Sequence, residues 1–330
     1  MLIRALAVLT AGLIVILSAC SQADRPPGPA EKVTIAIATP PFTVLADLAL
    51  ARDYFRQQGL EVTPHFHSIG KEALDDLLSG KADFATVAET PVMFAVMKGQ
   101  KISMIATIAR SRKTNVVIAR KDRGISAPSD LKGKLIAASL GTTADYYLNA
   151  FLTTHGVMRR DIKIVDMKAD EMVAALAEGR VDAVSAWPPY LERAEKLLGT
   201  DGISFHEQDI YTQTFNLVAM QDYVRANPTI VRKVLLALAE SEKFCVRNPA
   251  ESQRSVSDLR KIDKDILAAT WGNHSFDLTL DQHLLLFLED ESRWAMRNKL
   301  VKGAGLPNYL DTIYFDGLKS VKPDGVRILR

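Results

Sequence analysis

Short apolar runs alternate with helical patterns over most of this chain. Residues 32–39 read KVTIAIAT, which predicts a buried strand, and residues 42–57 then carry apolar side chains at α-helical spacing up to Gly59. The same alternation predicts strands at 60–67, 81–87 and 102–109 and a helix at 91–98. Strands that alternate with helices favour an α/β fold, in which mainly parallel sheets are covered by helices on both faces.

One α/β unit occurs twice. Its two copies read KEALDDLLSGKADFATVAETPV (71–92) and DEMVAALAEGRVDAVSAWPPYL (170–191). At an offset of 99 residues, Gly80 aligns with Gly179 and Asp83 with Asp182. Each aspartate follows a glycine and opens a strand, which is typical of a residue that caps a turn, so we expect neither to be catalytic.

The repeat predicts two similar three-layer lobes, because the wider pattern of 33–92 returns at 134–191. The chain then crosses between the lobes twice, around 120–124 and again around 208–215, which makes a two-segment hinge. Residues after the second crossing are mostly helical and have no partner in the repeat, so we expect them to cover the first lobe. The predicted boundaries are 32–121 plus 213–330 for lobe I and 122–212 for lobe II.

The first 31 residues differ from the rest. Arg4 precedes an apolar run at 5–17, which is short for a transmembrane helix of roughly 20 residues. The run ends in Leu17-Ser18-Ala19-Cys20, which is similar to the bacterial lipobox, and a proline-containing tether follows at 21–31. We predict a lipoprotein signal peptide at 1–20 and a protein anchored through lipidated Cys20, outside the cytoplasm in the bacterial cell envelope.

Composition excludes several classes of function. The formal net charge of +2 argues against a nucleic-acid binder, and two cysteines rule out a disulfide scaffold. His65 and His67 share one face of a strand, a spacing that can bind metal, but no third ligand with convincing spacing follows. We therefore predict no metal and no cofactor, and a buried, inert thiol at Cys245.

Candidate ligand contacts follow from the predicted topology, because ligands bind outside the carboxyl ends of the strands in open parallel sheets. Helices that begin beside these strand ends also present free N–H groups, which favour an anion. The candidates are Thr39, Pro40, Phe42, Thr43, Glu89, Thr90, Arg110, Ser139, Gly141, Thr142, Thr143, Trp187, Phe215 and Asn216.

Several candidates also have a structural interpretation. Residues 141–143 form an anion site or merely cap a helix. Phe42 and Trp187 would form apolar walls of the site, and Trp187 could instead pack in a core. Glu89 either favours an amine or an N–H-rich ring, or is a solvated residue at a helix start. Arg110 pairs with Glu89 or with a ligand carboxylate, or is exposed on a loop.

Several stretches together resemble the substrate-binding proteins of ABC importers for nitrate, sulfonates, taurine and pyrimidine thiamine precursors. They are residues 49–70, 79–92, 130–152, 175–194 and 307–326. The resemblance implies the type II periplasmic-binding-protein fold. Two departures stand out: Arg52-Asp53 where many relatives have glycine before Tyr-Phe, and Pro188 where many have aspartate.

This resemblance implies a monomeric, non-enzymatic protein that captures a small polar organic solute or oxyanion by hinge closure. Its partners would be the ligand, an ABC permease with its ATPase, and the membrane. Two alternatives remain: an enzyme of the same fold that resembles the pyrimidine-precursor synthases, and a ligand-sensing module of a membrane signalling system.

Overall fold

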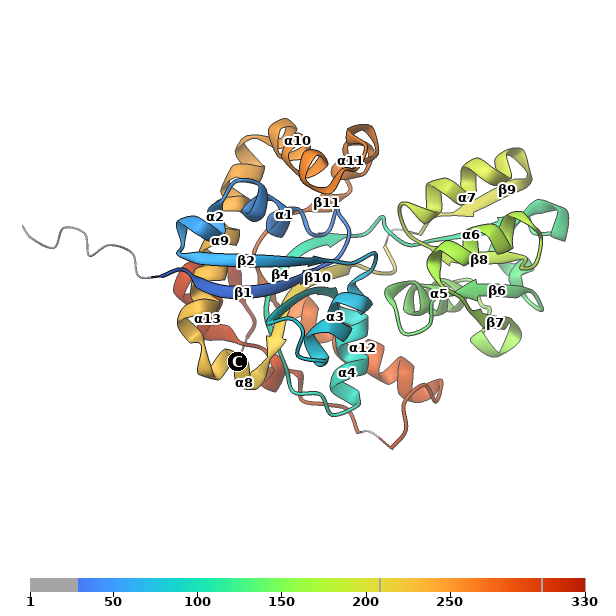
Figure 1. The fold of residues 1–330 in the computed structure, drawn as a ribbon. Helices are drawn as coiled ribbons and strands as arrows, with labels where there is room; N and C mark the ends of the chain where they lie inside the picture. The colour runs from blue at the N-terminus through green and yellow to red at the C-terminus, as the bar shows by residue number, and fades with distance from the viewer. Residues whose placement is uncertain (1–28, 208, 304, 330) are drawn as a thin grey trace, which may run out of the picture.

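A computed structural model describes residues 29–207, 209–303 and 305–329, which fold into two lobes joined side by side (Figure 1). The predicted signal peptide, Cys20 and residues 21–28 of the predicted tether lie outside the described residues. Within those ranges, the helices are all too short or too polar to cross a membrane.

Lobe I is built on a sheet with the strand order β11-β4-β10-β3-β1-β2. Its strands are β1 (Glu31–Ile37), β2 (Leu60–Phe66), β3 (Phe84–Ala88), β4 (Ile102–Ser111), β10 (Gln213–Met220) and β11 (His274–Ser275). β1 is parallel to β2 and β3, whereas β10 runs antiparallel between β3 and β4. The short pair β12 (Leu280–Asp281) and β13 (Val326–Arg327) lies apart from this sheet.

Helices cover both faces of the lobe I sheet, and most of them come from the C-terminal third of the chain (Figure 1). They are α1 (Val44–Ala51), α2 (Tyr54–Gln57), α3 (Gly70–Leu78), α4 (Glu89–Met97), α8 (Gln221–Ala226), α9 (Pro228–Arg247), α10 (Pro249–Arg260), α11 (Lys264–Trp271), α12 (Gln282–Arg297) and α13 (Phe315–Val321). The predicted helical cover of lobe I is therefore present. Its apolar faces join the strands in one core that includes Cys245, which is buried as expected.

Lobe II is smaller and repeats the same plan, with the strand order β7-β6-β8-β5-β9. Its strands are β5 (Val116–Arg120), β6 (Leu135–Ala138), β7 (Lys163–Asp166), β8 (Ala183–Ala186) and β9 (Gly202–Phe205), and its helices are α5 (Thr143–Thr154), α6 (Ala169–Ala177) and α7 (Tyr190–Leu198). Two apolar clusters separately cover the two faces of this sheet.

The placement of β5 moves one predicted boundary. The sequence assigned residues 116–120 to lobe I, but β5 pairs with β8 and β9 of lobe II. The first crossover therefore lies at 112–115, before β5, and the second joins β9 to β10 and ends at Gln213. β5 and β10 are equivalent, because each enters its lobe from a crossover and runs antiparallel to its neighbours.

The repeated aspartates occupy matching places in the two sheets. Asp83 Oδ2 accepts a hydrogen bond from the amide of Thr34 at 2.7 Å, and Asp182 Oδ2 accepts one from the amide of Leu135 at 2.8 Å. In each lobe the carboxylate thus joins the start of one strand, β3 or β8, to a backbone amide of the neighbouring strand, β1 or β6. These hydrogen bonds give the two repeated aspartates a structural role, as the sequence predicted.

Candidate ligand-binding site

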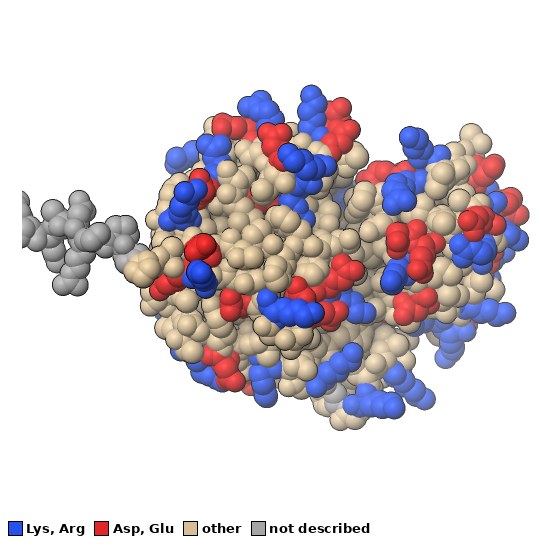
Figure 2. Space-filling model, viewed as in Figure 1, with Lys and Arg blue, Asp and Glu red and all other residues tan. Residues whose placement is uncertain are grey.

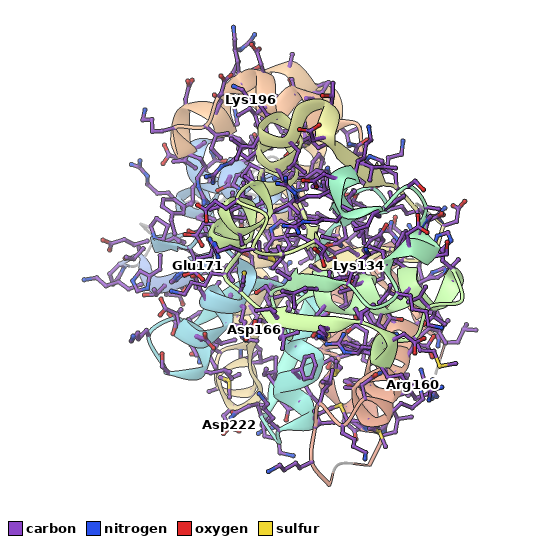
Figure 3. The ribbon with its side chains drawn as sticks, turned by 90° about the vertical axis from the view of Figure 1, so that its right-hand side faces the viewer. Lys134, Arg160, Asp166, Glu171, Lys196 and Asp222 are labelled. Atoms are coloured by element: carbon purple, nitrogen blue, oxygen red, sulfur yellow. The ribbon has the colours of Figure 1, made fainter. Side chains whose placement is uncertain are left out.

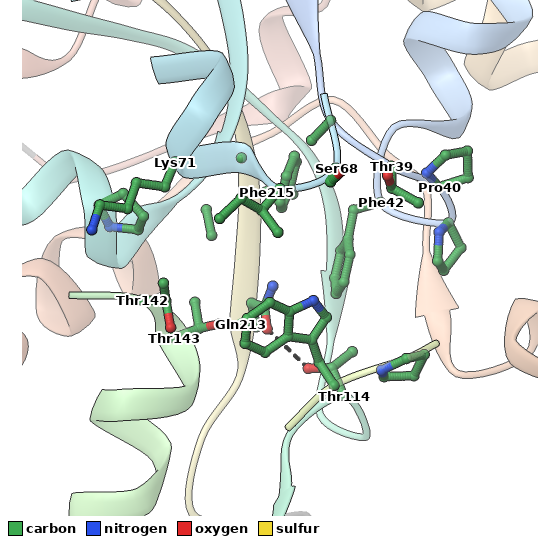
Figure 4. Close-up of a pocket in the computed structure, with 18 of the residues that line it drawn as sticks. Thr39, Pro40, Phe42, Ser68, Lys71, Thr114, Thr142, Thr143, Gln213 and Phe215 are labelled. Atoms are coloured by element: carbon green, nitrogen blue, oxygen red, sulfur yellow. Dashed lines mark hydrogen bonds between the residues drawn. The ribbon is translucent and has the colours of Figure 1, made fainter. Parts of the chain in front are cut away.

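A cavity that is open to solvent lies between the lobes, beside the carboxyl ends of their strands. Lobe I contributes the loops after β1 and β2, lobe II contributes the loops after β6 and β8, and both crossovers line its floor. Figure 4 shows Lys71 on one side of the cavity and Thr39, Pro40 and Phe42 on the other, with Thr142, Thr143 and Gln213 between them.

Two helices begin at this cavity, one from each lobe. Gly70 opens α3 and Thr143 opens α5, so the first-turn N–H groups of both helices lie at the cavity wall. Gly70 is needed for close packing, because an added Cβ would lie 3.0 Å from the Phe215 ring and 3.1 Å from the Cα of Val87. The arrangement concentrates hydrogen-bond donors and positive potential at one place.

Lys71 adds a full positive charge at the rim. Its Nζ donates to the backbone oxygen of Leu140 in lobe II, at a long 3.4 Å, and no ion pair to it is found among the described residues. None of the described residues that line the cavity carries a carboxylate. The charge balance therefore favours an anionic group near α3 and α5.

Aromatic rings form the other wall. Phe42 stacks on Phe215 with ring centroids 5.1 Å apart, and His274 meets Phe42 edge-on at 4.7 Å. Trp187 faces the cavity from lobe II and contacts Tyr190 edge-on. Rings from both lobes thus offer an apolar surface to the non-ionic part of a ligand.

Gln213 is held in one orientation by the crossovers. Thr114 Oγ1 and Asn115 Nδ2 each donate to its Oε1 at 3.0 Å. Because both bonds use the amide oxygen, the Nε2 group is left as a donor beside the cavity. Thr114 and Asn115 belong to the first crossover and Gln213 to the end of the second, so this donor lies where the lobes are joined.

Half of the predicted contacts come together at this cavity, and two more lie just behind it. The cavity-lining ones are Thr39, Pro40, Phe42, Thr142, Thr143, Trp187 and Phe215. Ser139 lies behind them and its backbone oxygen accepts from Thr142 Oγ1 at 2.7 Å. Gly141 adopts a positive φ of 73° and lines a neighbouring groove against Phe94.

Glu89 does not line the cavity, contrary to the sequence interpretation. Its carboxylate is fully buried behind the wall, where Oε1 accepts from the Tyr211 hydroxyl and Oε2 accepts from the amide and hydroxyl of Thr214, both at 2.8 Å. Burial raises the pKa of Glu89, against the effect of the Thr214 hydrogen bonds. Ala88 faces the cavity in its place.

Four further predicted contacts are turned into lobe I because partners within the lobe satisfy them. Thr43 Oγ1 donates to Asp47 at 2.6 Å, and Thr90 Oγ1 donates to Glu291 at 2.7 Å. Asn216 Oδ1 accepts from Thr107 at 2.8 Å. Arg110 pairs with Asp277 and Asp281 at 2.7 and 2.6 Å, rather than with Glu89 or a ligand.

Sequence reasoning missed Ser68, Lys71, Thr114, Gln213 and His274, all of which line the cavity. The strand-end rule would have found Ser68 and Lys71 if it had been applied to the loop after β2 as well. No comparable signal marks the others, because two lie on crossovers and His274 lies on a short edge strand near the C-terminus.

The paired histidines have a structural partner. His65 Nδ1 and His67 Nε2 lie 3.1 and 3.0 Å from Oδ2 of Asp76, on α3. Although partial burial opposes it, hydrogen bonding to both rings holds the pKa of Asp76 below its usual value. Across the described ranges no group of three histidine, cysteine or carboxylate side chains is arranged to hold a metal ion.

Fold and cavity together define a bilobal binding protein of the type II periplasmic class. The chain belongs to the NMT1/THI5-like family, whose model matches residues 45–252.

Three known proteins show the extent of the likeness. A Brucella abortus protein named as a binding protein is 25% identical over 225 residues, covering 67% of this chain and 69% of its own length. A Bacillus subtilis protein named for aliphatic sulfonate binding is 24% identical over 232 residues, covering 69% and 68%. The alkanesulfonate-binding protein SsuA of Xanthomonas axonopodis pv. citri, solved with bound MOPS, superposes with a TM-score of 0.73 at 19% identity, covering 88% of this chain and 99% of that structure.

The same fold also occurs in an enzyme. A solved desulfurization enzyme, DszB, superposes with a TM-score of 0.62 at 15% identity over 88% of this chain and 99% of that one. The fold alone therefore does not decide whether a protein binds its ligand or reacts with it. That distinction depends on the side chains of the cavity.

Proposed function

We propose that this protein is the extracytoplasmic solute-binding component of an ABC importer, and that its ligand is a small organic anion with an apolar body, a sulfonate above all. One observation carries the proposal: the first turns of α3 and α5 and the Lys71 side chain meet at a cavity whose described lining has no carboxylate. A sulfonate fits this donor-rich end, while its organic part fits the rings of Phe42, Phe215 and Trp187.

Ligand contacts from both lobes would favour closure. A sulfonate bound by α3 of lobe I and α5 of lobe II is held more tightly when the lobes approach, and this difference in affinity shifts the hinge toward the closed form. Gln213 and Thr114 link the ligand to the crossovers. Nothing in the cycle requires a bond to form or break.

Export and lipidation at Cys20 would hold the protein as a monomer on the outer side of a membrane, next to a permease with its ATPase. Figure 3 looks onto the end of lobe II, where Lys134, Arg160, Glu171 and Lys196 present both signs of charge. Figure 2 shows the same mixture over another face, with no large field of one sign. Docking to a permease would then rely on particular charge pairs rather than on overall charge.

The test is a thermal-shift screen of the protein from residue 31 onward. The panel contains alkanesulfonates, nitrate, carboxylates, amines and pyrimidines, and a true ligand raises the melting temperature in proportion to ln(1 + [L]/Kd). We expect alkanesulfonates to give the largest shift, and Lys71→Gln to reduce it. Lys98→Gln, at the residue that caps the C-terminus of α4 outside the cavity, is the matched control. A shift with amines or pyrimidines alone would refute an anionic ligand.

An enzymatic function of the pyrimidine-synthase or desulfurization kind has less support. Cys245 is the only cysteine that the structure describes, and it is buried away from the cavity with its pKa raised by burial to about 11. His274, the histidine at the cavity, has its pKa lowered by burial to about 4. Incubation with a bound sulfonate should therefore return it unchanged, and release of sulfite would indicate catalysis.

A further inference from the structure

His274 lines the candidate cavity, and one of its two ring nitrogens has no hydrogen-bond partner among the described residues. Its Nδ1–H donates to the backbone oxygen of Thr270 at 2.8 Å, whereas its Nε2 is buried and has no hydrogen-bond partner among the described residues. Because the proton is on Nδ1 in the neutral ring, Nε2 carries a lone pair and can only accept. Burial lowers the pKa of His274 to about 4, which keeps this acceptor available at neutral pH.

The ring cannot easily turn away to reach another donor. It packs edge-on against Phe42 at 4.7 Å and parallel to Phe276 at 6.0 Å, and the bond to Thr270 fixes its rotation. A buried acceptor that stays unpaired is destabilising, so the site becomes more stable when a ligand group donates to it.

Its place in the cavity is opposite the positive end. His274 contacts Phe42, which lies across the cavity from Lys71 in Figure 4. Most other polar groups identified at the cavity are donors, and they come from Lys71, the two helix starts and Gln213. His274 differs from them because its free ring nitrogen can only accept a hydrogen bond.

We propose that His274 determines ligand specificity by accepting a hydrogen bond from an N–H or O–H group on the ligand, at the end remote from its anionic group. This rests on the function proposed above, and it narrows the ligand class to organic anions, such as sulfonates, whose apolar body carries a hydroxyl or amino substituent. A plain alkane chain would leave Nε2 unpaired.

The experiment compares propane-1-sulfonate with 3-hydroxypropane-1-sulfonate and 3-aminopropane-1-sulfonate by calorimetry. The wild-type protein should bind at least one of the substituted sulfonates about tenfold more tightly than the plain one, the ratio that 1.4 kcal/mol represents. His274→Phe keeps a flat ring but removes the acceptor, so it should bind the three with similar Kd. His283→Phe alters an exposed histidine outside this cavity and should keep the wild-type preference.

The outcomes separate the two proposals. If the wild-type protein binds all three sulfonates equally, or if His274→Phe keeps the preference, His274 does not select the ligand, although the proposed function stands. If none of the three binds, the sulfonate class is wrong and the role of His274 falls with it. The wild-type comparison needs no variant, so the proposal can be tested even if His274→Phe does not fold.

Discussion

The two lobes share a topology but fix their cavity loops by different means. In each, an aspartate on the helix that follows a matching strand forms a buried ion pair with an arginine: Asp47 of α1 with Arg260 at 2.8 Å in lobe I, and Asp145 of α5 with Arg159 at 2.7 Å in lobe II. Arg159 follows soon after α5, whereas Arg260 comes from α10 of the C-terminal cover, 213 residues from Asp47.

This difference gives a second role to the C-terminal helices that cover lobe I, which were outside the sequence repeat. Arg260 also donates to the backbone oxygen of Ala38, at the cavity wall, at 2.8 Å. The C-terminal cover therefore does more than bury the lobe I sheet, because it holds the loop after β1 against the ligand site. Among the described residues lobe II has no such cover of its own, and its aspartate is paired by an arginine close in sequence, although Arg159 also lies 5.9 Å from the ring of Trp294 on α12.

The largest expected effect comes from breaking the long-range pair. Arg260→Met should reduce the free energy of unfolding by roughly 3 kcal/mol, because it leaves Asp47 buried without its charge partner. Burial already raises the pKa of Asp47 to about 6, so the loss should shrink as the pH falls and Asp47 becomes protonated. Urea unfolding at two pH values measures both effects.

Arg159→Met is the matched variant in lobe II. It should also destabilise the protein, but only Arg260→Met should in addition weaken ligand binding through the loop at Ala38. Equal losses of affinity in the two variants would mean that the cover has no special role at the site.

The second expected effect concerns the loops after β3 of lobe I and β8 of lobe II, which occupy matching places. Trp187→Ala should weaken binding of a sulfonate ligand about tenfold or more, since it removes an aromatic wall worth roughly 1.5–3 kcal/mol. Glu89→Gln should leave the Kd within about threefold, because the Glu89 side chain is behind the wall. Calorimetry on both variants measures the contrast, and a large loss of affinity in Glu89→Gln would restore Glu89 as a ligand contact.

Much of the fold was predictable because its signals are local. Strand and helix periodicities, the glycine stops and the repeated Gly-x-x-Asp motif specified the elements and the likeness of the lobes. The partner of β5 was not predictable in this way, since VVIAR reads as a buried strand whichever sheet it joins.

For the site, the main feature that the sequence could not predict was the direction in which the side chains at the strand ends point. Glu89 lies at the carboxyl end of β3, as expected, but its partners Tyr211 and Thr214 are 122 and 125 residues away along the chain. No local pattern shows that those donors will be present. Trp187 at the corresponding place makes no side-chain hydrogen bond to the described residues, and it lines the cavity.

The third expected effect tests the equivalence of the repeated aspartates. Asp83→Ala and Asp182→Ala should each lower the free energy of unfolding by about 1 kcal/mol, because each removes the acceptor for one backbone amide. Neither should alter ligand affinity, since both lie at the strand ends away from the cavity. Urea unfolding of the two single variants gives the comparison, and losses that differ by more than about twofold would show that the lobes do not use the motif alike.

The smallest expected effect concerns the cluster of Asp76, His65 and His67, which has no counterpart among the described residues of lobe II. Asp76 joins α3 to the edge strand β2 through His65 and His67, whereas the edge strand β7 ends in Asp166, which accepts from the amide of Leu140 at 3.0 Å. Because the pKa of Asp76 is lowered in the folded protein, its ionised form stabilises the fold at pH values above its unfolded pKa near 3.8.

That contribution should disappear as the pH falls through the lowered value. Asp76→Asn keeps the shape of the side chain but does not titrate. The wild-type protein should therefore be more stable than the variant at about pH 6, and the two should converge toward about pH 3. Urea midpoints measured across this range follow the difference. A gap that widens on acidification would mean that Asp76 is held in its protonated form, and that the histidines do not stabilise its charge.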